Sequence, residues 1–357
     1  MQKYFFLVLY VCITVKILFL HEVFNTMRKI FILYFLILSN FLVCAQEGNS
    51  AFTYLLLPGS ARAAALGGTN VSIIENDLSL IYQNPGFLGQ EMDKTINLNY
   101  LSYVGDIGAG SATFAKAIGT KSAWGIGFNY FNYGNMLQTT ENDEVLGDLS
   151  ARDICGNIFF SSDLTESIRG GITGKFLYSD YFSNTAIGLG VDLGLSYYNR
   201  DKNISIGLVG KNIGRQIKAY DTELLNLPWD IQLGFSQKLS HAPIRYSITS
   251  VNLPRWESYD IDGNKIPFPK TFFKHFVFGV ELLPTDNFWI GLGYSVKRGS
   301  DMSLTLNDGS GNTLGGFSIG AGLRVKAFSI GCSLAKYYPA ASSLMVSIST
   351  SLAEMKL

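Results

Sequence analysis

Residues 187–197 read Ile-Gly-Leu-Gly-Val-Asp-Leu-Gly-Leu-Ser-Tyr, and this stretch decides the fold. Large apolar side chains occupy every second position from Ile187 to Tyr197, while glycine, serine and one aspartate fill the positions between them. Successive side chains of a β-strand point to opposite faces. The stretch therefore predicts a strand with one wholly apolar face and one small, polar face.

The same alternation recurs along most of the chain. It predicts fourteen strands, at residues 95–104, 108–117, 121–133, 152–161, 165–178, 185–198, 203–213, 229–239, 243–252, 272–283, 287–298, 314–325, 327–337 and 343–352. Most of these segments have ten or more residues, whereas strands of water-soluble globular proteins usually have about five or six. A length of about ten residues matches a tilted strand that crosses a membrane.

The links between the expected strands alternate in length. Long links follow odd-numbered strands, at 134–151, 214–228, 253–271 and 299–313, whereas links after even-numbered strands are short turns such as 118–120 and 240–242. Short turns at one end and long loops at the other are typical of outer-membrane barrels. Hydrocarbon tolerates neither unpaired backbone donors nor an open sheet edge, so such a sheet must close. The pattern thus predicts that residues 95–357 form an all-β, transmembrane, antiparallel barrel of about 14 strands, with its long loops at the cell surface.

The composition agrees with a membrane barrel and excludes other classes. Hydrophobic residues make up 47% of the chain and aromatic residues 13%, which excludes a disordered protein. Charged residues make up only 16%, and 28 basic residues balance 28 acidic ones. No basic surface for nucleic acid is expected, and the expected surroundings are outer-membrane lipid.

Residues 1–45 are expected to be a signal region that is removed from the mature protein. Read from Met27, the sequence has a basic start at Arg28 and Lys29, an apolar centre, and small residues before a cleavage point after Ala45. One alternative is a transmembrane helix at residues 4–20, which Lys16 disfavours. Another is a lipoprotein anchored at Cys44.

Residues 46–94 precede the first expected strand and lack its alternation. A barrel of fourteen strands encloses a lumen that is either plugged or open as a channel. We therefore interpret 46–94 as an N-terminal hatch inside the lumen, and a periplasmic extension is the alternative.

The sequence offers one candidate binding loop and no catalytic or metal site. Trp256, Tyr259 and Phe268 lie in the 253–271 link, where aromatic side chains suit a protein contact, although they could instead fold over the barrel mouth. After residue 45 the only histidines are His241, in a short turn, and His275, which shares strand parity with Glu281. No nucleophile accompanies them, so no enzyme is expected. Cys155 and Cys332 lie far apart, and neither a metal nor a cofactor is expected.

Residues 54–88 resemble the start of the PorV/PorQ family of outer-membrane barrels, which are related to the FadL transporters. The matching residues include Ser60, Arg62, Gly67, Gly68, Asn84 and Pro85. Leu57-Pro58 and Ala65-Leu66-Gly67-Gly68 favour the PorQ branch, as do Gly291-Leu292-Gly293-Tyr294 and Gly316-Phe317-Ser318 farther along. Gly86-Phe87 departs from the family pattern of a small residue followed by leucine.

The resemblance implies a non-catalytic barrel of the type IX secretion system of Bacteroidota. Such a barrel would anchor a PorZ-like surface protein, with PorU and PorV in a larger attachment complex that processes cargo and couples it to anionic lipopolysaccharide. The alternative is a FadL-like transporter of hydrophobic small molecules. Such a transporter needs an apolar path through the lumen or a lateral opening in the wall. The lumen-facing parity is mostly glycine, serine, asparagine, aspartate and lysine, which argues against an apolar lining of the lumen.

Overall fold

The computed structural model describes residues 50–139, 145–182, 184–256, 265–305, 313–338 and 341–355. The expectations for the signal region, including Met27, Cys44 and Ala45, lie outside these residues, as does Tyr259. None of the described helices is long and apolar enough to cross a membrane.

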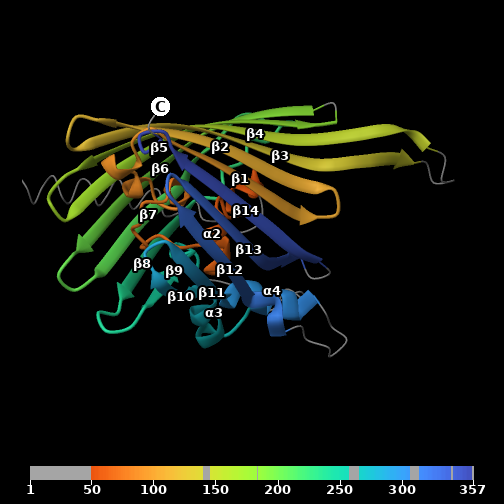
Figure 1. Cartoon of the computed structure of the whole chain (residues 1–357). Helices are drawn as coiled ribbons and strands as arrows, with labels where there is room; N and C mark the ends of the chain where they lie inside the picture. Colours follow the sequence, from red (N-terminus) through yellow and green to blue (C-terminus); the bar gives the residue numbers. More distant parts are fainter. Residues whose placement is uncertain are drawn as a thin grey trace, which may run out of the picture. The chain divides into compact units, whose positions relative to one another are not determined.

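Fourteen antiparallel strands form a closed barrel, which confirms the predicted fold class (Figure 1). Each strand pairs with its neighbours in sequence, and β1 closes the sheet against β14 with Thr95 opposite Ser351. The first seven strands are β1 Thr95–Val104, β2 Ile107–Ile118, β3 Ser122–Thr139, β4 Val145–Asp163, β5 Ile168–Tyr181, β6 Asn184–Asn199 and β7 Ile204–Lys218. The others are β8 Asp230–Lys238, β9 Ile244–Ser250, β10 Phe276–Thr285, β11 Phe288–Ser295, β12 Phe317–Val325, β13 Phe328–Tyr338 and β14 Ala341–Ser351.

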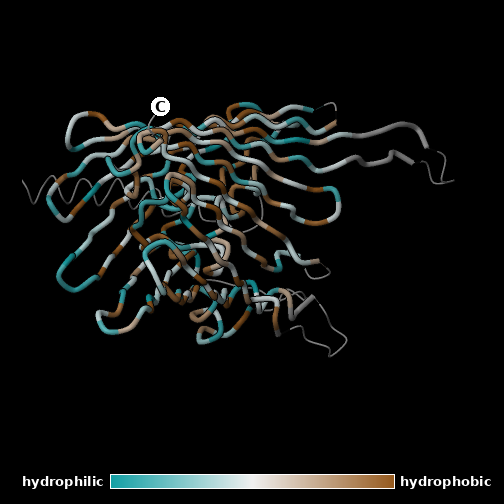
Figure 2. Tube along the Cα trace, in the orientation of Figure 1, coloured by the Kyte–Doolittle hydropathy of each residue, from teal (hydrophilic) through white to brown (hydrophobic). Residues whose placement is uncertain are grey.

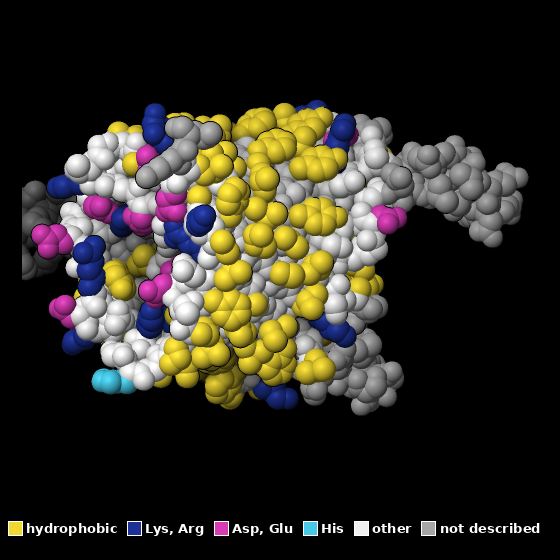
Figure 3. Space-filling view, in the orientation of Figure 1, with side chains coloured by type: hydrophobic (Ala, Val, Ile, Leu, Met, Phe, Trp, Pro, Cys, Tyr) yellow, Lys and Arg dark blue, Asp and Glu magenta, His cyan; other side chains and the backbone are white. Residues whose placement is uncertain are grey.

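Hydrophilic and hydrophobic residues alternate along the strands (Figure 2). The burial of these residues shows that one parity faces inward and the other outward. In β6, the residues from Ala186 to Ser196 that share the polar parity are buried, whereas Leu189, Leu193 and Leu195 of the other parity are exposed. Hydrophobic side chains gather on the outside in a band that crosses the barrel, beside a zone rich in charged residues (Figure 3). An apolar exterior between polar borders suits a lipid bilayer.

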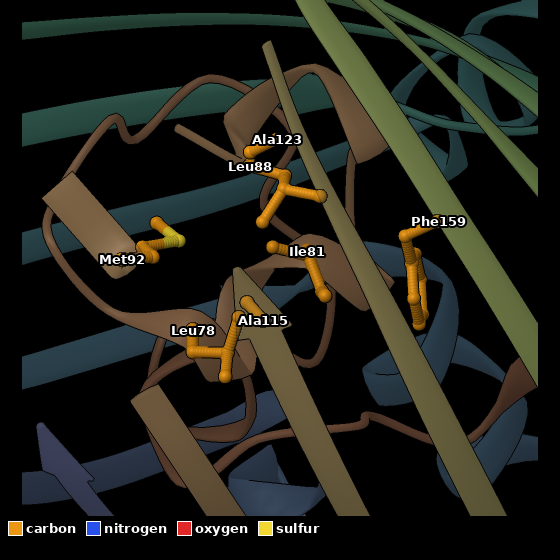
Figure 4. Packing of buried hydrophobic residues seen from close by; sticks show 7 residues of the cluster. All are labelled: Leu78, Ile81, Leu88, Met92, Ala115, Ala123 and Phe159. Atoms are coloured by element: carbon orange, nitrogen blue, oxygen red, sulfur yellow. The ribbon is translucent and has the colours of Figure 1, made fainter. Parts of the chain in front are cut away.

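Residues 50–94, here called the hatch, lie inside the barrel. The hatch contains α2 Ala61–Ala65 and the short 3-10 turns η2 Thr53–Leu56, η3 Leu78–Tyr82, η4 Pro85–Phe87 and η5 Gln90–Met92. Its apolar side chains form small clusters against the wall. In the cluster of Figure 4, Leu78, Ile81, Leu88 and Met92 of the hatch pack on Ala115, Ala123 and Phe159 of β2, β3 and β4.

The structure corrects several expected boundaries on the long-link side. Strand β3 continues to Thr139 and strand β4 begins at Val145, so most of the expected 134–151 loop is strand. Residues Phe268–Lys274 form the helix α3, and β10 begins only at Phe276. Pro267 and Pro269 favour this helix because the fixed φ of proline suits the first turn.

β11 ends at Ser295 and is followed by the helix α4, Val296–Thr305, where a continued strand to residue 298 was expected. Met302 and Arg298 lie one helical turn apart, and both point to the interior: Met302 is buried, and Arg298 bonds to carbonyl oxygens there. The short turn η6, Thr313–Gly316, precedes β12.

Candidate functional site

Helix α2 packs against the inner face of β11 to β14, and every residue from Ala61 to Ala65 is buried. Four of these five residues are alanine, and their small side chains let the helix approach the wall closely. The Ser60 hydroxyl accepts a hydrogen bond from the Ala63 amide at 3.1 Å and caps the helix. The Ala61 amide donates to the Ser347 hydroxyl of β14 at 2.8 Å. The small polar residues of the wall therefore bind backbone groups of the hatch.

Gly67 and Gly68 turn the chain after α2. Both have φ +97°, a conformation that strains residues with a side chain. The Gly67 amide donates to the Ser318 hydroxyl at 2.9 Å, and its carbonyl accepts from Arg298 of α4 at 3.3 Å. This turn is therefore held by the wall on one side and by α4 on the other.

A buried charge network joins the hatch to β9 and β10. The Arg62 Nε lies 2.7 Å from Glu281 Oε1, and Arg245 Nη2 lies 2.6 Å from Glu281 Oε2. Arg245 also reaches Glu75 Oε1 of the hatch, at 2.5 Å. The guanidinium of Arg62 lies 5.2 Å from the ring centroid of Trp289. Removing one member of such a buried group leaves an uncompensated charge, which is strongly destabilising.

Asn84 and Pro85 form a third attachment, against β6 and β7. The Asn84 amide nitrogen donates to the carbonyls of Val71 and Leu195, at 3.1 Å each, while its oxygen accepts from the Gly86 amide at 2.8 Å. A Cβ at Gly194 of β6 would lie 2.1 Å from that oxygen, so the wall requires a glycine there. Gly86, which departs from the family pattern, contributes the amide of this turn.

A cavity of about 460 Å³, here called the vestibule, lies at the end of the barrel where links follow odd-numbered strands. Leu55, Leu56 and Leu57 of the hatch line one side of it. Leu56 is 62% exposed although it belongs to the hatch. The wall contributes Lys211, Asp230, Gln232 and Val277, and the chain after β9 contributes Val251. Helix α4 contributes Met302 and the charged residues Lys297, Arg298 and Asp301.

The candidate loop residues lie at the same end of the barrel but outside the vestibule lining. Trp256 and Phe268 stack with ring centroids 6.2 Å apart, and they are 41% and 65% exposed. Trp256 also covers His275, at 4.4 Å between ring centroids. The structure therefore brings these two candidates together.

The expected parity of His275 with Glu281 is wrong, because His275 follows α3 and precedes the strand. Its Nδ1 lies 2.8 Å from the carbonyl oxygen of Val251, while Glu281 binds Arg62 and Arg245. Within the described residues, no three His, Cys, Asp or Glu side chains are placed to hold a metal ion.

Sequence reasoning did not single out Glu75, Arg245, Leu55 or Leu56, and it noted Leu57 only as part of the family motif. Arg245 and Glu281 stand on the lumen parity of their strands, and two opposite charges on that parity are a signal for an interior ion pair. Leu55 to Leu57 carry no such signal, because their exposure depends on how the hatch folds.

Neither a protein-family model nor a curated protein sequence matches this chain. Solved structures do. The toluene transporter TodX of Pseudomonas putida aligns with a TM-score of 0.51 at 14% identity, over 82% of this chain and 96% of that one. A deletion mutant of TodX, described as a monoaromatic hydrocarbon channel, gives a TM-score of 0.53 at 14% identity, over 83% and 100% of the two chains. A FadL homologue of Pseudomonas aeruginosa aligns with a TM-score of 0.49 at 13% identity, over 83% and 99%. At such identities the likeness is one of fold, and the fold shared with TodX is a barrel of the outer-membrane type.

Proposed function

We propose that this chain is an outer-membrane channel that takes up small apolar molecules and binds them first in the vestibule. The observation that carries the proposal is the row of hatch leucines, with Leu56 largely exposed inside a cavity of about 460 Å³. Ligand pockets commonly have volumes of about 300–1,000 Å³ and mostly apolar linings. The fold is similar to that of proteins described as a toluene transporter and a monoaromatic hydrocarbon channel.

The leucines provide the affinity in this proposal. Each 100 Å² of apolar surface removed from water contributes about 2.5 kcal/mol. A single aromatic ring placed on Leu56, which is 62% exposed, would bury apolar surface on the ring and on the leucine. The polar residues of the β7–β8 wall, including Lys211 and Asp230, leave the opposite side of the vestibule hydrated.

Onward passage requires the hatch to move. Its attachments at Ser60, at Arg62 and at Asn84 occupy the inner face of the wall, and buried contacts surround each of them. Breaking the charge network around Glu281 would leave buried charges without partners, so this attachment resists hatch movement most. We therefore propose that breaking this network controls the opening of the hatch.

The test compares toluene uptake by cells that produce the full chain or its variants. Replacing Leu56 by aspartate places a charge on the apolar side of the vestibule and should lower the initial rate about tenfold. Leu164, equally exposed at 62% but in a short turn at the other end of the barrel, gives the matched variant Leu164→Asp. That variant should take up toluene normally. Equal rates in cells with and without the chain would contradict the proposal.

A surface anchor of the type IX secretion system is the second candidate. The hatch residues shared with the PorV/PorQ family and the exposed Trp256–Phe268 pair support it. In this candidate the long loops lie at the surface of a Bacteroidota-type cell and hold a PorZ-like protein beside PorU and PorV. Co-purification of such a protein in stoichiometric amount, lost in Trp256→Ala, would support the anchor over the channel.

A further inference from the structure

The apolar band on the outside of the barrel is not equally tall on all sides. On β6 the outward positions from Ile187 to Tyr197 are all apolar. On β9, which has only 7 residues, the outward positions are Ile244, Tyr246 and Ile248, followed by Ser250. A strand needs about 9–11 residues to cross a bilayer. Strand β9 is therefore too short to cover the hydrocarbon by itself.

Beyond β9 the chain stays beside the wall. The Val251 amide donates to the His275 carbonyl at 2.8 Å, and the Leu253 amide donates to the Ile231 carbonyl of β8 at 3.3 Å. These bonds satisfy backbone donors where regular strand pairing has ended. Residues 251–256 and α3 thus occupy the place where longer strands would stand.

The side chains of α3 face in two directions. Thr271 and Lys274 are buried, and the Lys274 ammonium lies 3.0 Å from Asp301 of α4. Phe268 and Phe273 point away from the barrel and are 65% and 58% exposed. The helix therefore turns Thr271 and Lys274 toward the protein and its rings outward, while Lys270 is exposed.

These rings continue the band of β10. The ring of Phe272 lies 5.1 Å from that of Phe276, which lies 6.2 Å from that of Phe278 on the outward face of the strand. Figure 3 shows hydrophobic side chains over the position of α3, at the foot of the band. We call Trp256, Phe268, Phe272 and Phe273 the aromatic patch.

We propose that the aromatic patch is embedded in lipid and completes the hydrocarbon-facing wall where β9 is too short. A protein contact is the competing occupant. Protein interfaces carry a polar rim around an apolar centre. Here the rings continue through Phe276 into the apolar outer face of β10, and of the two lysines of α3 Lys274 is turned inward while Lys270 is exposed. Continuity with the lipid-facing band therefore favours lipid, which agrees with the channel and disagrees with a surface anchor that docks on Trp256.

The test measures quenching of single tryptophans in the full chain, folded into vesicles of phosphatidylcholine with brominated acyl chains. The chain has four tryptophans, so three variants each keep one of them and carry phenylalanine at the others. Trp124 on the outer face of β3 is the lipid-facing reference, and Trp289 beside Arg62 is the interior reference. Trp256 should lose at least half of its fluorescence to brominated lipid, as Trp124 does, and iodide in the buffer should leave it unchanged.

Strong quenching of Trp256 by iodide without quenching by brominated lipid would overturn the proposal and place the patch in water, where a protein docks. Where a triple replacement fails to fold, the difference in quenching between the native chain and Trp256→Phe gives the same comparison. Lipid quenching that is equal in these two proteins would likewise contradict the proposal.

Discussion

The inner and outer faces of the wall come from the same strands but meet different surroundings. Outward residues such as Leu189 and Leu193 are exposed on the protein surface, and their contribution depends on the lipid around them. Inward residues such as Ser318 and Glu281 are buried against the hatch and bond to it directly. The polar parity of the strands is thus a binding surface for the protein's own N-terminal segment, rather than the lining of an open pore.

This difference changes the argument about transport. The polar lumen parity argued against a path for apolar molecules as long as the wall alone was considered. In the structure, the hatch contributes Leu55, Leu56 and Leu57 to the lining of the vestibule, together with Gly67, Gly68, Thr69 and Gln83. The surface that a ligand meets depends on the hatch as much as on the wall.

The largest expected effect is on the inner face, at Glu281. Glu281→Ala leaves Arg62 and Arg245 buried without their shared carboxylate, which should lower the free energy of hatch opening by about 3–5 kcal/mol. Hydrogen exchange at the amides of α2 measures this free energy. The control is Asp286→Ala, because the Asp286 side chain is 97% exposed and its ion pair with Lys238 spans 3.6 Å. Protection of α2 that is the same in both variants would contradict the role of the network.

On the outer face, a charge should be costly at mid-height and tolerated near the edge. Leu193→Lys, in the middle of β6, should lower the free energy of unfolding in vesicles by about 2–4 kcal/mol. Tyr197→Lys, close to the end of the same strand, should cost about 0–1 kcal/mol. A denaturant titration of both variants checks the difference, and equal costs would mean that the band does not face hydrocarbon.

Replacing one glycine on the inner face and one on the outer face by alanine compares the two faces of the wall directly. A Cβ at Gly207 would lie 1.6 Å from the Val71 carbonyl oxygen of the hatch, whereas a Cβ at Gly174 meets nothing within 4 Å. Gly207→Ala should therefore destabilise the hatch by about 1–3 kcal/mol, and Gly174→Ala should not. Hydrogen exchange of residues 69–73 in the two variants measures the effect. Unchanged exchange in Gly207→Ala would show that the hatch does not press on β7.

The smallest expected effect is a pH dependence of hatch opening. Burial alone would raise the pKa of the Glu75 carboxyl, but Arg62 and Arg245 hold this pKa below its ordinary value of 4.5. A carboxyl whose pKa is lowered in the folded state contributes stability above its ordinary pKa and loses it as the pH falls through the lowered value. The protection of the α2 amides from hydrogen exchange, which is the ratio of the intrinsic to the observed exchange rate at each pH, should therefore fall below about pH 4.5 in the native chain. The acid-dependent part of this change should be smaller in Glu75→Gln, and an identical pH profile would exclude Glu75 as its source.

The strands could be predicted closely because apolar and polar residues that alternate along about ten positions fit a β-strand and no other regular structure. Most predicted strand ends lie within about four residues of the observed ones, and the closure follows from the apolar outer face. The helices α3 and α4 could not be predicted in this way. Each is short, and each depends on contacts with distant residues, such as Lys274 with Asp301 or Arg298 with the Gly67 carbonyl.

The site was predictable in part. The residues of the PorV/PorQ-like motif that were expected in the hatch, such as Arg62 and Asn84, make its main contacts with the wall. Their partners, Glu281 and the Leu195 carbonyl, lie 219 and 111 residues away in sequence, and no local pattern connects them.

The central claim is that an apolar molecule binds between the hatch leucines and the wall. A crystal structure of the full chain soaked with bromobenzene tests it most directly, because the anomalous signal of bromine locates the ligand without assumption. The account predicts a bromine peak in the vestibule, against Leu56, that is lost in Leu56→Asp. Bromine peaks confined to the outer face of the barrel, with none in the vestibule, would contradict it.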